Sequence, residues 1–418
     1  MDSRQTDCVK EFSRGKNIFL TGSAGTGKSF MISQLMSCGK QMKKYIGCTA
    51  MTGNAAILLG SKATTLHSYT GIGLGKDSTE KIYERIKKNK KIYTRWRKMD
   101  VLIIDEVSML GPELFIKLES LGRIIRKNER PFGGIQLVLV GDFFQLPPVE
   151  EKQFLFESPL FEKCIEKKIV LKTVYRQKKD QDWFDILQNI RIGNVKPSYI
   201  DILKERVCQS KGINRQEMTC LYSLNRKVNT INHYYLHQLG ADIKTFTYQI
   251  HHRKENTDND EIESFLKTMN ILTDIELCVN AKIILTWNID IENELVNGSQ
   301  GEIMRFSTEG NPIVKFKHVI IEIKPIEYIK YMDDSDEEIR FCITQLPLRL
   351  SWALSIHKMQ GQSIDEAYMD LGNDIFEYGQ IYVALSRIKT LNGVYLSDFN
   401  HDKIKVNPKV LDFYQTLE

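Results

Sequence analysis

Residues 22–29 have the types and spacing that bind a nucleoside triphosphate. Their sequence is GSAGTGKS, with an apolar run before it at 18–21 and a helical pattern after it. Glycines let backbone N–H groups approach phosphate oxygens, Lys28 would meet the β- and γ-phosphates, and the Ser29 hydroxyl would bind Mg²⁺. A glycine loop can be only a tight turn, but the preceding strand and the Lys-Ser pair favour an ATP site.

Two adjacent carboxylates, Asp105 and Glu106, follow another apolar run at 101–104. A carboxylate at the end of a buried strand can hold Mg²⁺ through water, and the next one can orient or deprotonate an attacking water. We therefore predict Asp105 as the metal residue and Glu106 as the base. Acids that only cap a strand would give the same pattern, but the glycine loop already requires a metal partner.

Three further residues could act on the terminal phosphate. Gln145 lies in GDFFQLPPV, which follows a fourth apolar run and could reach the γ-phosphate. Arg176 in VYRQ and Arg387 in YVALSR could be arginine fingers, which neutralise charge on the transferring phosphate. A single arginine is more often part of a surface ion pair, so these roles depend on the whole set.

The elements that must position these residues are strands of a parallel sheet. The apolar runs are continuous rather than alternating, with helical stretches between them, and they lie at 18–21, 46–50, 101–104, 137–140 and 169–171. This pattern is typical of parallel strands that helices cover on both faces. Ligands bind beyond the carboxyl ends of such strands, so the glycine loop, the acidic pair and Gln145 should meet at one edge.

The second half of the chain predicts a less regular α/β region. The expected strands are 219–223, 282–287, 346–354, 367–371 and 394–397, and the expected helices are 225–239 and 379–389. Short β-like runs with glycine turns at 296–323 indicate a small inserted β-module. The predicted fold class is α/β, with two parallel-sheet domains and this insertion.

The composition is that of a globular chain and excludes a membrane-spanning protein. The chain has 418 residues, of which 42% are hydrophobic, and a net charge of +5 that permits nucleic-acid binding. No apolar run approaches the roughly 18–20 residues that cross a bilayer, and the N-terminus lacks the apolar core of a secretory signal. We expect a soluble intracellular protein, nuclear or cytoplasmic. Its eight cysteines, without a CxxC pair, indicate reduced thiols rather than zinc ligands.

The motifs in this order resemble the Pif-one (petite integration frequency) helicases of superfamily one, in the branch that also contains RecD. The resemblance includes CTAMTGNAA (48–56), TTLHSYTGIGLG (64–75), DEVSML (105–110) and LSIHKMQGQS (354–363). RKNERPFGGIQL (126–137) is similar to a signature that other helicases lack. Gln5 lies at the distance from the glycine loop that matches the family's adenine-recognising glutamine.

Carried over position by position, this resemblance implies the site residues. The nucleotide would be bound by Gln5, Gly22, Gly25, Thr26, Gly27, Lys28, Ser29 and Gly361. Mg²⁺ would be held by Ser29 and Asp105. The catalytic residues would be Lys28, Asp105, Glu106, Gln145, Arg176 and Arg387. Single-stranded DNA would be held by Thr49, Thr52, His67, His357 and Lys358.

The resemblance also implies an organisation and an activity. Two RecA-like domains would span 1–170 and 171–295 with 346–418, with a wedge element at about 71–98 and an SH3-like β-module at 296–345. The family uses ATP to move 5′-to-3′ on single-stranded DNA and to unwind duplex, forked or structured DNA. RNA–DNA hybrids and G-quadruplexes are further expected partners. We expect a monomer when the protein is free, and no membrane partner.

Two alternatives have the same nucleotide site. One is a translocase that displaces proteins without separating strands. The other is an inactive nucleic-acid-binding regulator, which would require damage to a catalytic set that is intact in this sequence.

One basic segment is informative without the family. Residues 87–98 carry seven Lys and Arg residues around Tyr93 and Trp96. Such a surface could bind phosphates while the aromatic rings stack on bases. The alternative is a solvated helix face with Trp96 packed inward. We favour a surface that lies near DNA.

Overall fold

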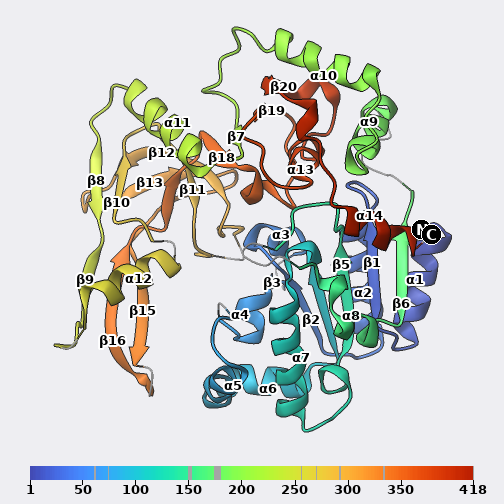
Figure 1. The fold of residues 1–418 in the computed structure, drawn as a ribbon. Helices are drawn as coiled ribbons and strands as arrows, with labels where there is room; N and C mark the ends of the chain where they lie inside the picture. The colour runs from blue at the N-terminus through green and yellow to red at the C-terminus, as the bar shows by residue number, and fades with distance from the viewer. Residues whose placement is uncertain are drawn as a thin grey trace. The chain divides into compact units, whose positions relative to one another are not determined.

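The computed structural model describes residues 1–60, 63–73, 75–148, 153–173, 180–255, 257–269, 271–290, 293–332 and 335–417. The chain forms two compact units (Figure 1). The large unit is Met1–Asn225 with Leu354–Glu418, and the small unit is Arg226–Ala353. No helix in the described ranges is both long and apolar enough to cross a membrane.

The large unit contains a six-stranded sheet in which all neighbouring strands are parallel. The strand order is β3 (Thr64–Thr65), β2 (Ile46–Ala50), β4 (Val101–Asp105), β5 (Gln136–Gly141), β1 (Ile18–Gly22) and β6 (Lys167–Leu171). All five apolar runs predicted as strands lie in this sheet, so the parallel-sheet prediction is confirmed. The sequence pattern did not reveal β3, because two residues are too few to show a period.

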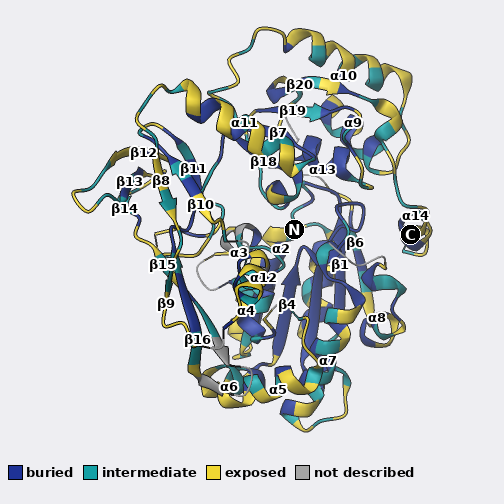
Figure 2. Ribbon diagram, turned by 60° about the vertical axis from the view of Figure 1, so that its left-hand side comes forward, coloured by how far each residue is buried: buried dark blue, intermediate teal, exposed yellow. Residues whose placement is uncertain are grey.

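Successive strand residues point to opposite sides of the sheet, and helices cover the apolar side chains on both faces. Ile18 and Leu20 pack in one core with α1 (Ser3–Ser13) and α2 (Lys28–Gln41). Phe19 points the other way and contacts Phe161 of α8 (Pro159–Cys164) and Phe413 of α14 (Pro408–Gln415). Strands β1, β4 and β5 are buried along their length as a result (Figure 2).

Other helices of this region are α3 (Gly53–Leu58), α4 (Leu66–Thr70), α5 (Thr79–Lys88), α6 (Lys90–Lys98) and α7 (Pro112–Arg126). Short 3₁₀ turns lie at η1 (Val107–Met109), η2 (Pro131–Gly134) and η3 (Leu155–Glu157).

A second sheet belongs to the second half of the large unit. Its order is β18 (Ala353–Ser355), β7 (Cys220–Tyr222), β19 (Ala367–Leu371) and β20 (Val394–Phe399), and β19 is parallel to both β7 and β20. Its helices are α9 (Gln181–Arg191), α10 (Pro197–Gln209) and α13 (Gln380–Ser386), with 3₁₀ turns η4 (Ile356–Met359), η5 (Leu391–Gly393) and η6 (His401–Lys403). The large unit therefore has the α/β class that the sequence predicts.

The small unit is rich in antiparallel strands. Its five-stranded sheet has the order β14 (Ile320–Glu322), β13 (Pro312–Lys315), β12 (Gln300–Phe306), β11 (Lys282–Leu285) and β17 (Leu348–Leu350). Two smaller sheets contain β8 (Lys244–Thr247) with β10 (Asp274–Leu277), and β15 (Ile326–Met332), β16 (Ser335–Gln345) and β9 (Gln249–His251). Its helices are α11 (Asn225–Gln238), whose first residue belongs to the large unit, and α12 (Asn259–Met269).

The predicted β-module at 296–345 contains β12 to β16. β11 and β17 lie outside that range, yet β11 pairs with both β12 and β17 in the same sheet. The predicted domain boundaries and the SH3-like character of the module stay predictions.

Helices α5 and α6 carry the basic segment. Trp96 is only 1% exposed, and its Nε1 donates a hydrogen bond of 2.8 Å to the Thr70 carbonyl. Stacking of Trp96 on a base is therefore excluded, and the inward-packed alternative is correct for this residue. Six basic side chains around it are exposed: Lys87, Lys88, Lys90, Lys91, Arg97 and Lys98.

We expect Trp96→Ala to lower the free energy of unfolding by about 3–5 kcal/mol, because it leaves a large cavity and a carbonyl without its donor. Urea unfolding followed by circular dichroism measures this. Lys98→Ala is the matched control, since exposed substitutions change stability by about 0.5 kcal/mol or less. Equal stabilities of the two variants would contradict the buried position of Trp96.

Candidate active site

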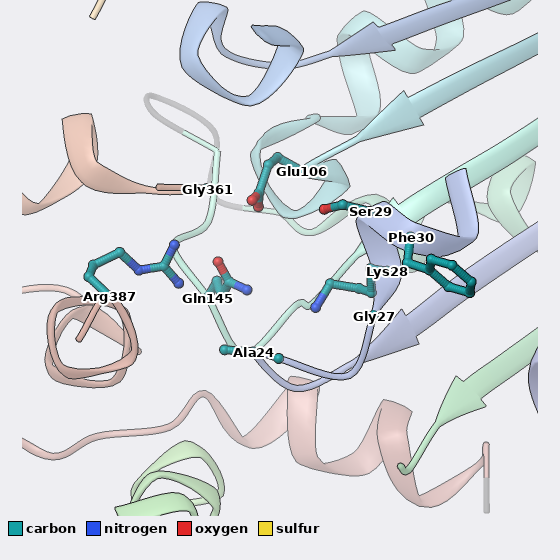
Figure 3. A pocket seen from close by; sticks show the side chains of 10 residues that line it. Ala24, Gly27, Lys28, Ser29, Phe30, Glu106, Gln145, Gly361 and Arg387 are labelled. Atoms are coloured by element: carbon teal, nitrogen blue, oxygen red, sulfur yellow. The ribbon is translucent and has the colours of Figure 1, made fainter. Parts of the chain in front are cut away.

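A pocket of about 320 Å³ in the large unit brings together most of the predicted nucleotide residues (Figure 3). Those that line it are Gly25, Gly27, Lys28, Ser29, Glu106, Gln145, Gly361 and Arg387, together with Ala24 and Phe30. The lining comes from the loop after β1 and the first turn of α2, from the loops after β4 and β5, and from residues after β18 and α13. The carboxyl ends of the parallel strands therefore meet as the sequence predicts.

The glycine loop joins β1 to α2 and adopts a conformation that needs glycine. Gly25 and Gly27 have φ of 84° and 86°, in the left-handed region, and Gly27 caps the N-terminus of α2. The Lys28 ammonium donates to the carbonyls of Gly22 and Ser23 at 2.7 and 3.0 Å. Burial lowers the pKa of Lys28, although three nearby carboxylates partly offset this effect. A helix N-terminus, a cation and the exposed Ser29 hydroxyl form a set suited to a polyphosphate.

The acidic pair lies at the end of β4. Asp105 is buried, and its Oδ1 accepts a hydrogen bond of 2.9 Å from the Glu106 backbone N–H. Burial and the neighbouring Glu106 raise the pKa of Asp105 to about 7. Glu106 has a φ of 55°, a left-handed conformation that is uncommon for a residue with a side chain. This backbone turn places its carboxylate in the pocket.

Glu106 is held by the turn after η4. Gln360 Nε2 donates to Glu106 Oε2 at 3.2 Å and to Ser108 Oγ at 3.1 Å. Gly361 has a φ of +83°, and a Cβ there would lie 3.2 Å from Glu106 Oε1. Sequence reasoning missed the roles of Gln360 and Ser108. The HKMQG motif was the available signal, but it does not show which distant residue Gln360 contacts.

Two of the predicted phosphate sensors, Gln145 and Arg387, line the pocket (Figure 3). Gln145 is buried, and its Oε1 has no hydrogen-bond partner among the described residues. Arg387 is also buried, and its guanidinium donates to the carbonyls of Val383 and Gln362 and to Ser386 Oγ. Arg176 lies outside the described residues.

A buried ionic network that the sequence did not reveal is centred on Asp142 in the large unit. Asp142, directly after β5, is fully buried and accepts two hydrogen bonds of 2.8 Å from Arg191 at the end of α9. Burial alone would raise the pKa of Asp142, but the Arg191 guanidinium and its hydrogen bonds hold it below its ordinary value. The hydroxyls of Tyr382 in α13 and Tyr414 in α14 donate to the same carboxylate at 3.4 and 3.1 Å.

Tyr382 connects this network to the glycine loop. Its hydroxyl accepts a hydrogen bond of 2.9 Å from the backbone N–H of Ala24, which lines the pocket. Asp142, Tyr382 and Ala24 therefore form a continuous hydrogen-bonded path from α9 to the phosphate-binding loop.

Three predicted nucleotide residues lie outside the pocket lining. Gln5 is buried in the capping box of α1, where its side chain accepts from the Asp2 N–H. The Thr26 hydroxyl donates to the Ser23 carbonyl at 2.8 Å, and a Cβ at Gly22 would lie 2.7 Å from Thr26 Oγ1. Thr26 and Gly22 thus shape the loop, and a contact of Gln5 with a base stays a prediction.

The predicted DNA residues differ in accessibility. Thr49 is fully buried and its hydroxyl donates to the Ile103 carbonyl, which argues against contact with single-stranded DNA. Thr52 Oγ1 accepts from the Ala55 N–H at the start of α3. His67 and His357 are half-buried, and burial lowers the pKa of both rings. Lys358 is exposed. Contacts of Thr52, His67, His357 and Lys358 with DNA stay predictions.

Comparison with known proteins shows the family to which this chain belongs. The model of the PIF1-like helicase family matches residues 5–199. The crystal structure of the Pif1 helicase from Candida albicans is 34% identical in sequence, with a TM-score of 0.88 over 100% of this chain and 98% of that one. The chain belongs to the PIF1-like helicase family.

Two further members of the PIF1-like family are informative. The Pif1 helicase from Bacteroides in complex with ADP-AlF3 and ssDNA is 26% identical, with a TM-score of 0.79 over 99% of this chain and 96% of that one. The ATP-dependent DNA helicase PIF1 of Xenopus laevis is 36% identical over 97% of this chain. This chain spans 62% of the length of that relative.

In this PIF1-like chain, we expect Asp142→Asn to lower the free energy of unfolding by about 3–5 kcal/mol, because it leaves the Arg191 guanidinium buried without its counter-charge. The matched control is Asp365→Asn, which breaks an exposed pair with Lys389 and should cost about 1 kcal/mol at most. Urea unfolding of both variants tests this difference. A similar loss in the two would show that the network is not structurally important.

Proposed function

We propose that this chain is an ATP-dependent DNA helicase, which hydrolyses ATP in the pocket and moves along single-stranded DNA. The observation that carries this proposal is the composition of the pocket. The glycine loop, Glu106 and Gln145 come from the six-stranded sheet, whereas Gly361 and Arg387 come from the second half of the large unit. A nucleotide that contacts both sets of residues would hold them together, and its hydrolysis would allow them to move apart.

The side chains have distinct roles in this proposal. Lys28 leaves the loop carbonyls to meet the β- and γ-phosphates. Glu106, fixed by Gln360, orients and deprotonates the attacking water. Gln145 and Arg387 stabilise charge on the γ-phosphate, with Arg176 as a second arginine finger.

The donor set fits a magnesium ion. Ser29 and Asp105 offer oxygen ligands, which Mg²⁺ prefers. A cation there would also favour the ionised form of Asp105, whose carboxylate is otherwise costly to bury. When bound, the ion would neutralise phosphate charge, and Ser29 and Asp105 would hold it.

We propose single-stranded and forked DNA as the partners. The exposed basic face of α5 and α6 supports this, and so does the DNA in the complex of the Bacteroides relative. Thr52, His67, His357 and Lys358 are the proposed strand contacts, and Gln5 the adenine contact. We also propose that the protein moves 5′-to-3′, is a monomer when free, and accepts RNA–DNA hybrids or G-quadruplexes as substrates. The proposed wedge lies at about 71–98 and the proposed SH3-like module at 296–345.

We expect Glu106→Gln to reduce ATP turnover by about 100-fold or more, because the amide cannot accept a proton from water. ATP affinity should be retained, since Lys28 and the glycine loop are unchanged. Steady-state turnover and binding of a fluorescent ATP analogue measure the two effects. Glu162→Gln, at an exposed ion pair with Lys168, is the control and should turn over ATP as the unaltered protein does. Unchanged turnover in Glu106→Gln would remove this residue from the role of base.

The helicase proposal is tested by ATP turnover with and without a single-stranded oligonucleotide, followed by unwinding of duplexes with a 5′ or a 3′ tail. We expect the oligonucleotide to stimulate turnover and the 5′-tailed duplex to be unwound. Lys28→Ala should bind the oligonucleotide without turnover. Stimulated turnover without unwinding would favour the protein-displacing translocase. Binding without any turnover by the unaltered protein would favour the inactive regulator.

A further inference from the structure

Three metal-ligating side chains meet in the small unit, and none of them lines the nucleotide pocket, whose residues all belong to the large unit. His233 and His237 lie on α11, and Glu276 lies on β10. One ligand atom from each lies within 4.8 Å of the other two. His233 Nδ1 is 3.3 Å from Glu276 Oε2.

The spacing of the two histidines has a direct geometric meaning. Residues four apart on a helix lie on the same face, so His233 and His237 present both imidazoles to one point. Two histidines and one carboxylate form a ligand set that Zn²⁺ uses, with remaining positions open to water. The oxygen donors of the nucleotide pocket suit Mg²⁺ instead, so the two sites would select different ions.

The backbone at each ligand is fixed by the same hydrophobic core. Leu236 precedes His237, Ile275 and Leu277 flank Glu276, and all three apolar side chains are buried in that core. Asn232, next to His233, is buried, and its side-chain amide bonds to the backbone of Ala353 through both its oxygen and its nitrogen. A bound ion would therefore need rearrangement only of side chains, which keeps the entropy cost of binding low.

A simple ion pair explains only part of this arrangement. The contact of His233 with Glu276 could be a solvent-exposed pair, since these side chains are 56% and 36% exposed. Such a pair would not require the His237 side chain to lie beside those of His233 and Glu276. We propose that His233, His237 and Glu276 bind a divalent ion of the zinc class, which clamps α11 to β10.

This ion stabilises the small unit. A ligand that binds the folded state and not the unfolded chain raises the midpoint of thermal unfolding. Since α11 begins where the large unit ends along the chain, the clamp fixes the first helix of the small unit to its sheet. The exposed histidines leave open positions on the ion for water.

The full chain, stripped of metal with a chelator, tests this proposal in two measurements. Titration with Co²⁺ should give a visible absorption band of a bound ion, and Zn²⁺ should abolish it by competition. Zn²⁺ should also raise the midpoint of thermal unfolding. His233→Ala and His237→Ala should each lose the band and the shift, and Glu276→Gln should weaken Co²⁺ binding about tenfold or more.

His318→Ala, at another exposed histidine of the small unit, is the matched control and should behave as the unaltered protein does. The far-UV circular dichroism of all four metal-free variants should match that of the unaltered protein, which establishes that each is folded. The site is overturned if the unaltered protein shows no saturable binding of Co²⁺ and Zn²⁺. It is also overturned if binding survives both in His233→Ala and in His237→Ala. Loss in the histidine variants with full affinity in Glu276→Gln overturns the three-ligand arrangement.

Discussion

The structure depends on the pairing of one fully buried carboxylate. Asp142 cannot stay ionised in the interior without a counter-charge, and Arg191 supplies it through two hydrogen bonds. Tyr382 and Tyr414 satisfy the same oxygens. Helices α9, α13 and α14 are thereby fixed around Asp142, which directly follows β5 and lies three residues before Gln145. The ion pair that the fold requires is also the one that positions the pocket.

A second constraint acts from the other side of the site. Gln360 bonds to both Glu106 and Ser108, so the proposed base is oriented by a residue from the second half of the chain. Together with the Tyr382–Ala24 bond, this joins the second half of the chain to both the glycine loop and the loop after β4. In the proposed cycle, movement of η4 would change the orientation of Glu106, and movement of α13 would change the shape of the glycine loop.

The sequence predicted what local patterns encode. Continuous apolar runs identified five strands of the first sheet, and the glycine loop and acidic pair identified most of the pocket lining. Pairing between distant residues was not accessible, because neither the HKMQG motif around Gln360 nor the sequence around Arg191 shows which distant residue each side chain contacts. Burial of Trp96 and Thr49 was also hidden, since a motif does not show which way a side chain points. Residues 245–277 are polar and resemble the family poorly, so the sequence supported no prediction for them, yet Ile262 and Leu266 of α12 pack with Phe341 of β16.

The hydrogen bonds of Lys28 bear on selectivity. Its ammonium already has two carbonyl partners within the loop, so an incoming group must offer a stronger attraction to draw it away. A triphosphate, with several negative oxygens near the N-terminus of α2, provides that attraction, whereas an uncharged nucleoside does not. The loop therefore discriminates by charge before any base contact is made, and a spent nucleotide without its terminal phosphate holds the ammonium less strongly.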